Sequence, residues 1–71
     1  RHVLTKMPEM TYLAFASLTP VLGFSIKEAK YELAKTDYPT NFSLSSNEFV
    51  GDKSVTIELE SGIVAVIQAR D

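Results

Sequence analysis

The sequence contains no cysteine, which excludes disulfide bonds and thiolate metal sites. Small secreted domains usually depend on such links, so their absence favours an intracellular chain or a piece of a larger one, and we expect a cytoplasmic protein. Histidine is almost as scarce, since the only one, His2, lies at a chain end where side chains are mostly exposed. We therefore predict no metal site.

Catalytic motifs are also missing. There is no glycine-rich phosphate loop and no Asp-x-Asp calcium loop, and the serines have no evident base to activate them. Glu58 and Glu60 could act as a pair of carboxylates, but two glutamates beside a turn more often form a solvated strand edge. We expect a protein that is not an enzyme, with no catalytic residues and no cofactor.

The charge balance does not favour nucleic acid as a partner. The formal net charge is −2 and the isoelectric point about 5.3, which gives no overall basic field. Residues 10–26 are uncharged and approach the shortest membrane span of about 17 residues, but Pro20 and Gly23 interrupt them. We expect a buried element followed by a turn, and no membrane partner.

The overall composition indicates one ordered domain. Hydrophobic residues make up 45% of the chain and charged residues 23%, which are ordinary values for globular proteins. We expect a single small domain over residues 1–71, either complete or a fragment of a longer chain.

The clearest predicted element is a helix over residues 26–36. Ser25 and Glu28 are spaced as a capping box, and Ile26 and Leu33 would share one face of the helix. The end is marked by Tyr38-Pro39, because a residue before proline is disfavoured in helical geometry.

Residues 10–18 are harder to assign. Pro8 and Glu9 suit the first turn of a helix, but the apolar residues would surround that helix and would equally cover both faces of a strand. We favour a helix and leave the strand open. Residues 11–30 also resemble the helix–turn–helix of the C-terminal domain of the bacterial ribosomal stalk protein, through Gly23 and the run Lys27-Glu28-Ala29-Lys30. The resemblance implies two adjacent helices and, in that family, a face that docks translation factors.

The second half of the chain indicates strands. Phe42 and Leu44 alternate with polar residues, turn residues follow at Asn47 and Gly51-Asp52, and Ser61-Gly62 reads as the tip of a tight β-hairpin. The predicted fold class is therefore α+β: an N-terminal helical segment and one capped helix packed on a three-stranded antiparallel sheet that ends in the hairpin.

The last arm of this hairpin is apolar on both faces, which indicates an interface. Val64 and Val66 would join the core, whereas Ile63, Ala65 and Ile67 would need cover from elsewhere. Together with Tyr12 and Phe15 they form a predicted partner-binding surface. The leading hypothesis is a non-enzymatic protein-interaction module that associates with itself as a homodimer or belongs to a larger assembly.

The alternative hypothesis is a winged-helix-like DNA-binding protein that uses the helix over residues 26–36. Lys27, Tyr31 and Lys35 would line one face of that helix and could contact phosphates. Glu28 and Glu32 flank this row and cancel much of its field, so a solvated face of mixed charge is the simpler interpretation.

Overall fold

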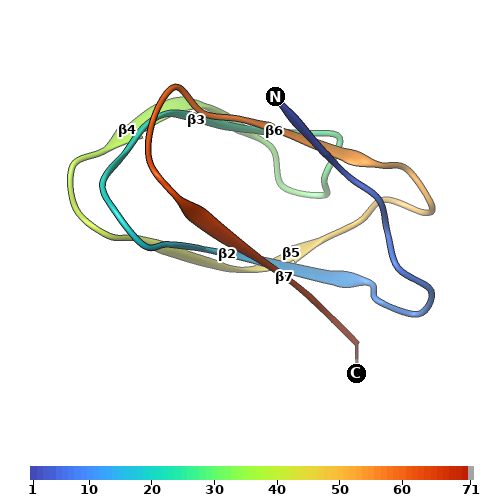
Figure 1. Cartoon of the computed structure of the whole chain (residues 1–71). Helices are drawn as coiled ribbons and strands as arrows, with labels where there is room; N and C mark the ends of the chain where they lie inside the picture. The colour runs from blue at the N-terminus through green and yellow to red at the C-terminus, as the bar shows by residue number, and fades with distance from the viewer. Residues whose placement is uncertain (71) are drawn as a thin grey trace.

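The computed structural model describes residues 1–70, which form seven β-strands and no helix. Two antiparallel sheets face each other (Figure 1), one in the order β1-β6-β3-β4 and the other in the order β5-β2-β7. The chain is therefore a β-sandwich. The strands are β1 (His2–Leu4), β2 (Tyr12–Ser17), β3 (Val21–Lys27), β4 (Leu33–Tyr38), β5 (Ser43–Glu48), β6 (Val55–Glu58) and β7 (Val64–Ala69).

The core lies between the two sheets. Phe15 of β2 and Phe24 of β3 are fully buried and meet edge to face, with ring centroids 5.8 Å apart. Fully burying a side chain of this size contributes roughly 1.5–3 kcal/mol. The buried apolar residues are Leu13, Phe15, Val21, Phe24, Ile26, Ala29, Phe49, Val55 and Ile57.

The predicted α+β fold, with a helix over residues 26–36, is wrong. Val21–Lys27 forms β3, which pairs with β6 on one side and β4 on the other. Ile26 is 1% exposed and lies opposite both Ile57 and Leu33. The Ser25–Glu28 capping pattern is only a local preference, and pairing on two sides with burial of one face outweighs it.

The second predicted helix, over residues 10–18, is also wrong, because the segment is the central strand of the three-stranded sheet. Leu13 and Phe15 point into the core, while Tyr12 and Ala14 face outward. Apolar residues on both faces hide the two-residue period that normally identifies a strand. The same finding overturns the helix–turn–helix resemblance, since residues 11–30 contain β2 and β3.

The predicted β-hairpin does not form, because β6 and β7 belong to different sheets. β6 pairs with β1 and β3, so both of its edges are occupied and β7 pairs with β2 instead. The chain crosses between the sheets after β6, and the Glu60 N–H donates to the Leu22 carbonyl at 2.8 Å. A strand after Pro39 and a turn at Gly51-Asp52 are confirmed.

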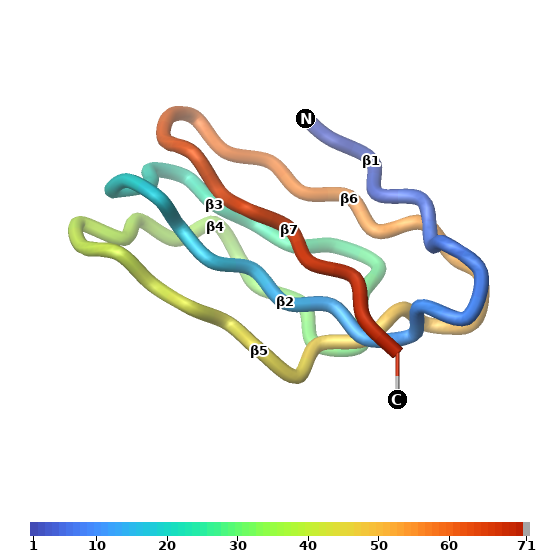
Figure 2. Tube along the Cα trace, turned by 60° about the horizontal axis from the view of Figure 1, so that its bottom comes forward, coloured from blue at the N-terminus to red at the C-terminus, as the bar shows by residue number. Residues whose placement is uncertain are grey.

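The sandwich has two long sides, shown in Figure 2. β4 and β5 border one side, and β1, β6 and β7 border the other. Over residues 1–70, no helix is long and apolar enough to cross a membrane.

Candidate functional site

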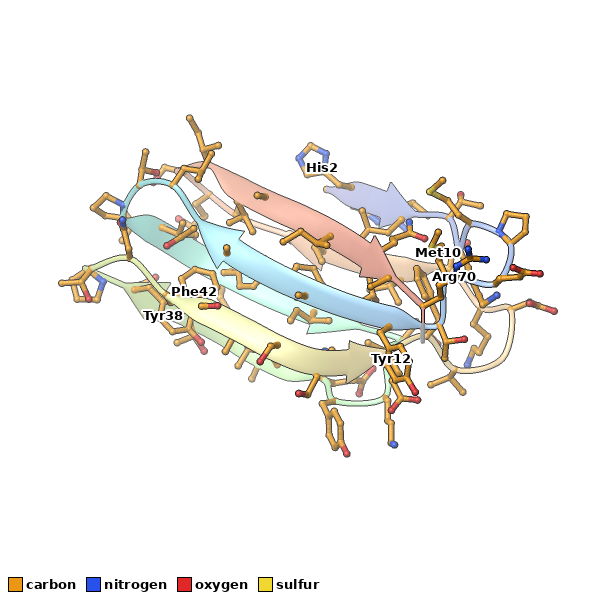
Figure 3. The ribbon with its side chains drawn as sticks, turned by 90° about the horizontal axis from the view of Figure 1, so that it is seen from below. His2, Met10, Tyr12, Tyr38, Phe42 and Arg70 are labelled. Atoms are coloured by element: carbon orange, nitrogen blue, oxygen red, sulfur yellow. The ribbon has the colours of Figure 1, made fainter. Side chains whose placement is uncertain are left out.

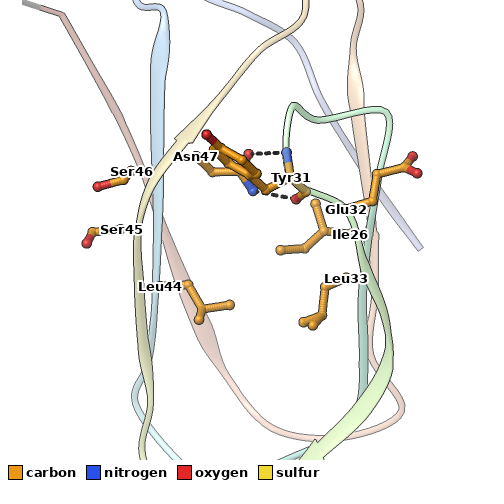
Figure 4. A pocket seen from close by; sticks show the side chains of 8 residues that line it. All are labelled: Ile26, Tyr31, Glu32, Leu33, Leu44, Ser45, Ser46 and Asn47. Carbon is orange, nitrogen blue, oxygen red and sulfur yellow. Dashed lines mark hydrogen bonds between the residues drawn. The ribbon is translucent and has the colours of Figure 1, made fainter.

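The candidate site is a pocket on the side of the sandwich bordered by β4 and β5. Its volume is about 370 Å³, near the lower end of the roughly 300–1,000 Å³ typical of ligand sites. Figure 4 shows Ile26, Leu33 and Leu44 directed into the space between the strands, beside the Tyr31–Asn47 pair. The lining residues are Ile26, Tyr31, Glu32, Leu33, Leu44, Ser45, Ser46 and Asn47.

Asn47 fixes the backbone of Tyr31. Its side-chain Oδ1 accepts hydrogen bonds from the Tyr31 N–H at 3.0 Å and the Glu48 N–H at 2.9 Å, and its Nδ2 donates to the Tyr31 carbonyl at 2.9 Å. Asn47 is only 6% exposed. The buried amide therefore holds the loop between β3 and β4 against β5, together with the Lys30 N–H, which donates to the Glu48 carbonyl at 2.9 Å.

The Tyr31 side chain is exposed although its backbone is fixed. It is 58% exposed, and the Lys30 Nζ lies 5.4 Å from its ring centroid, within the range of a cation–π contact. Lys30 also donates to the Glu48 carboxylate at 3.2 Å. This hydrogen bond, with the Glu48 charge, raises the pKa of Lys30 above its usual value. The site thus presents an aromatic ring whose main chain cannot easily move.

Two residues beside the pocket have strained backbones. Glu28 has a φ of 71° and Ser46 a φ of 69°, in the left-handed region that costs a non-glycine residue roughly 1–2 kcal/mol. Strain of this kind tends to gather at functional sites. At Ser46 the positive φ coincides with the register shift between β5 and β2, a β-bulge that turns Asn47 toward the core.

Charged groups hold the remainder of the loop. The Glu28 N–H donates to the Glu32 carboxylate at 2.7 Å, and the Lys53 Nζ lies 2.8 Å from the Glu28 Oε2. The hydrogen bond from Lys53 is the main reason that the pKa of Glu28 is lowered. The loop is therefore tied both to β5 and to the segment between β5 and β6.

The predicted partner-binding residues do not all share a surface. Tyr12, Ala65 and Ile67 lie on the outward face of the three-stranded sheet, the face seen in Figure 3. Ile63 is 56% exposed just before β7 begins, whereas Phe15 is fully buried in the core and cannot contribute to that surface. A partner at the outward face stays a prediction.

The row of Lys27, Tyr31 and Lys35 does not exist as one helical face. Lys27 ends β3, Tyr31 lies in the following loop, and Lys35 in β4 forms an ion pair with Glu60. The winged-helix alternative is therefore wrong. Tyr31 is the one member of the row that lines the pocket.

Sequence reasoning missed the roles of Ser46 and Asn47. Asn47 was assigned to a turn, but it occupies a buried position in β5. The signal was a polar amide two residues before the apolar Phe49, on the strand face that Phe49 shares, but the register shift between Leu44 and Asn47 hides it from the alternation that begins at Phe42. A buried amide must find hydrogen-bond partners, and here it finds Tyr31.

The chain matches the family described as thiamin pyrophosphokinase, vitamin B1 binding domain, over residues 1–64. Among solved structures, it is 36% identical to a thiamin pyrophosphokinase family protein from Enterococcus faecalis, with a TM-score of 0.89. It is 34% identical to a protein from Lactobacillus plantarum, with a TM-score of 0.85. No curated protein matches the chain significantly.

Each of these comparisons covers 99% of this chain but 32% of the solved protein. The chain thus spans about a third of the length of these relatives. The family is named for an enzyme, so the hypothesis of a non-enzymatic protein-interaction module is wrong as a function. Association with a second copy or within a larger assembly stays a prediction. The match covers most of the sequence, and the chain belongs to the thiamin pyrophosphokinase vitamin B1 binding domain family.

Proposed function

We propose that this chain binds thiamin at the pocket of Tyr31 and Asn47, as the thiamin-recognising part of a thiamin pyrophosphokinase. The description of its family names vitamin B1 binding, and the solved protein from Enterococcus faecalis is a thiamin pyrophosphokinase family protein. The observation that carries the proposal is the exposed Tyr31 ring, whose backbone is held by the buried Asn47 amide.

The chemistry of the pocket suits the two rings of thiamin. An aminopyrimidine can stack on the face of Tyr31, and such aromatic pairs contribute about 0.5–1.5 kcal/mol beyond area burial. Leu33 and Leu44 offer an apolar floor, and Ser46 offers a hydroxyl that can donate or accept. The cationic thiazolium is favoured by carboxylates such as Glu32 at the rim.

The proposal assigns thiamin recognition to this chain and leaves the transfer of pyrophosphate to the rest of a longer family protein. The matched region is 32% of each solved relative. Binding and transfer can therefore be measured separately, because the first requires only this domain.

The test is calorimetric titration of thiamin into the 71-residue chain and two variants at Tyr31. Tyr31→Ala should weaken binding about 2- to 12-fold, which corresponds to the loss of one aromatic pair. Tyr31→Phe keeps the ring and should bind nearly as the parent chain does. Thermal unfolding should change little in either variant, because the side chain is mostly exposed.

Leu22→Ala provides the matched control, since Leu22 is 47% exposed and does not line the pocket. Equal affinity of the parent chain and Tyr31→Ala would refute the assignment of the site. Absence of thiamin binding at millimolar concentration would refute the proposed function itself.

A further inference from the structure

A second apolar groove lies on the other side of the sandwich, between β1 and β6 of one sheet and β7 of the other. Its volume is about 320 Å³. One sheet has four strands and the other has three, so one strand of the wider sheet has no strand opposite it. β4 lies across from β5 at the pocket, and β3 packs on β2 through Phe24 and Phe15. The strand left over is β1, which extends past β7. The groove is lined by His2, Leu4, Ile57, Leu59, Gly62, Ile63, Val64 and Val66.

The outer edge of β7 borders this groove. The Leu18 N–H donates to the Ile63 carbonyl at 2.9 Å, and hydrogen-bonded pairs alternate along an antiparallel ladder. Ala65 and Ile67 therefore direct their backbone groups toward β2, and Val64 and Val66 direct theirs toward the groove. Within residues 1–70, β7 pairs with β2 alone.

This edge lacks the usual protection against strand addition. β7 pairs with β2 over six consecutive residues without a bulge and contains no charged residue or proline. Natural edge strands are normally protected by such features, and an edge without them is a template for pairing with another strand.

The overhang of β1 decides what can occupy the groove. If β7 of a second copy paired antiparallel with this β7, the two-fold axis would stand perpendicular to the sheet. In the second copy, β6 covers that copy's own β7. In the paired arrangement, this β6 would therefore occupy the space that β1 of the first copy already fills. A single strand without a second layer fits beneath β1, and a second sandwich does not.

The ends of the groove limit the length of that strand. The Gln68 side chain accepts from the Met7 N–H at 2.9 Å and donates to the Thr5 carbonyl at 3.0 Å, which closes one end. Val64–Ile67 remains accessible, so an added strand has about four paired residues, or roughly 13 Å at 3.3 Å each.

We propose that β7 accepts one extended segment, supplied by the part of a full-length family protein that lies outside these 71 residues. The segment pairs with the backbone of Val64 and Val66 and places alternate apolar side chains under Leu4 and Leu59. About two-thirds of each solved relative lies outside the matched region, which provides the chain for such a strand. The groove and the thiamin pocket lie on opposite sides, so this proposal does not depend on thiamin binding.

The first test compares amide hydrogen exchange in the 71-residue chain and in the full-length Enterococcus faecalis protein. The amides of Val64 and Val66 should exchange rapidly in the short chain, and the aligned amides should exchange at least about tenfold more slowly in the full-length protein. Equal rates in the two proteins would overturn the proposal. Protection in the short chain that rises with protein concentration would assign the edge to a second copy and also overturn it.

The second test uses proline in β7. Val66→Pro removes an N–H that points into the groove rather than a bond to β2. The packing of the Val66 side chain on the core is lost in the short chain and in the full-length relative alike. It should lower the melting temperature of the full-length relative, at the aligned position, by several degrees more than that of the short chain. Ala65→Pro is the matched control, since it removes a bond to β2 and should destabilise both proteins alike. An equal effect of Val66→Pro in both would contradict the proposal.

Discussion

Replacing Asn47 with alanine tests how the candidate site is held together. The variant loses three hydrogen bonds, two to the backbone of Tyr31 and one to the Glu48 N–H. Each contributes about 0.5–1.5 kcal/mol net, which sums to roughly 1.5–4.5 kcal/mol. Water can reach the released Tyr31 groups, since these bonds are only partly buried, so we expect a loss of about 2 kcal/mol.

A loss of this size is large for so small a domain. A core of this size supplies about 3–5 kcal/mol of stability, and 1 kcal/mol corresponds to about 4–8 °C in melting temperature. Asn47→Ala should therefore melt roughly 8–16 °C below the parent chain. Circular dichroism during heating gives this shift, and hydrogen exchange at the Tyr31 amide shows whether the loop has been released.

Ser45→Ala is the control, because Ser45 is an exposed neighbour on the same strand. Its unfolding free energy should stay within about 0.5 kcal/mol of the parent value. The reasoning is refuted if Asn47→Ala changes stability no more than this control does and leaves the Tyr31 amide protected.

Three further predictions concern strain and charge. Ser46→Gly relieves a φ of 69° and should stabilise the chain by about 0.5–1 kcal/mol in urea unfolding, while thiamin affinity falls; unchanged stability would contradict the strain. Gly23→Ala should lower the free energy of unfolding by about 1–2 kcal/mol, because Gly23 has a positive φ. The new Cβ would also lie 2.6 Å from the Glu60 Oε2. A second change, Glu60→Ala, removes this clash but not the backbone strain, so it should restore the melting temperature only partly. Lys53 lowers the pKa of Glu28, and Glu28 raises the pKa of Lys53. The ion pair therefore stabilises the fold fully at a pH above the usual pKa of Glu28. This stabilisation is lost as the pH falls through the lowered pKa that Glu28 has in the folded chain. Glu28→Gln should therefore lower the melting temperature at pH 7 and make less difference near about pH 3; a difference that persists in acid would rule out the ion pair as its cause.

The limits of the sequence interpretation follow from where burial occurs. In β2, Tyr12 and Ala14 are as apolar as the inward-facing Leu13 and Phe15, so neither a helical nor a two-residue period was evident. In β3, the capping-box pattern of Ser25 and Glu28 does not lead to a helix, because pairing with strands that lie far away in sequence outweighs it. Such long-range pairing cannot be read from one segment alone.

The burial of Val55 and Ile57 was predictable, because these residues alternate with polar neighbours. The separation of β6 and β7 into different sheets was not predictable. A tight turn at Ser61-Gly62 favours a hairpin only if both strands have an edge available, and β1 and β3 already occupy β6.

Of the residues at the candidate site, the sequence singled out Tyr31 alone, and for a different role. It was expected to contact nucleic-acid phosphates from one face of a helix together with Lys27 and Lys35, which lie elsewhere. Its true partner, Asn47, is 16 residues away in sequence. The contact depends on the loop after β3 reaching β5, which belongs to the opposite sheet.

The most direct test of the account is to titrate the isotopically labelled chain with thiamin and to follow its backbone amides by NMR. The account predicts that the largest shifts fall on Tyr31, Leu33 and the β5 residues Leu44–Asn47, and that Tyr31→Ala removes them. Shifts concentrated in the groove beside β7, or no shifts with thiamin at millimolar concentration, would contradict it.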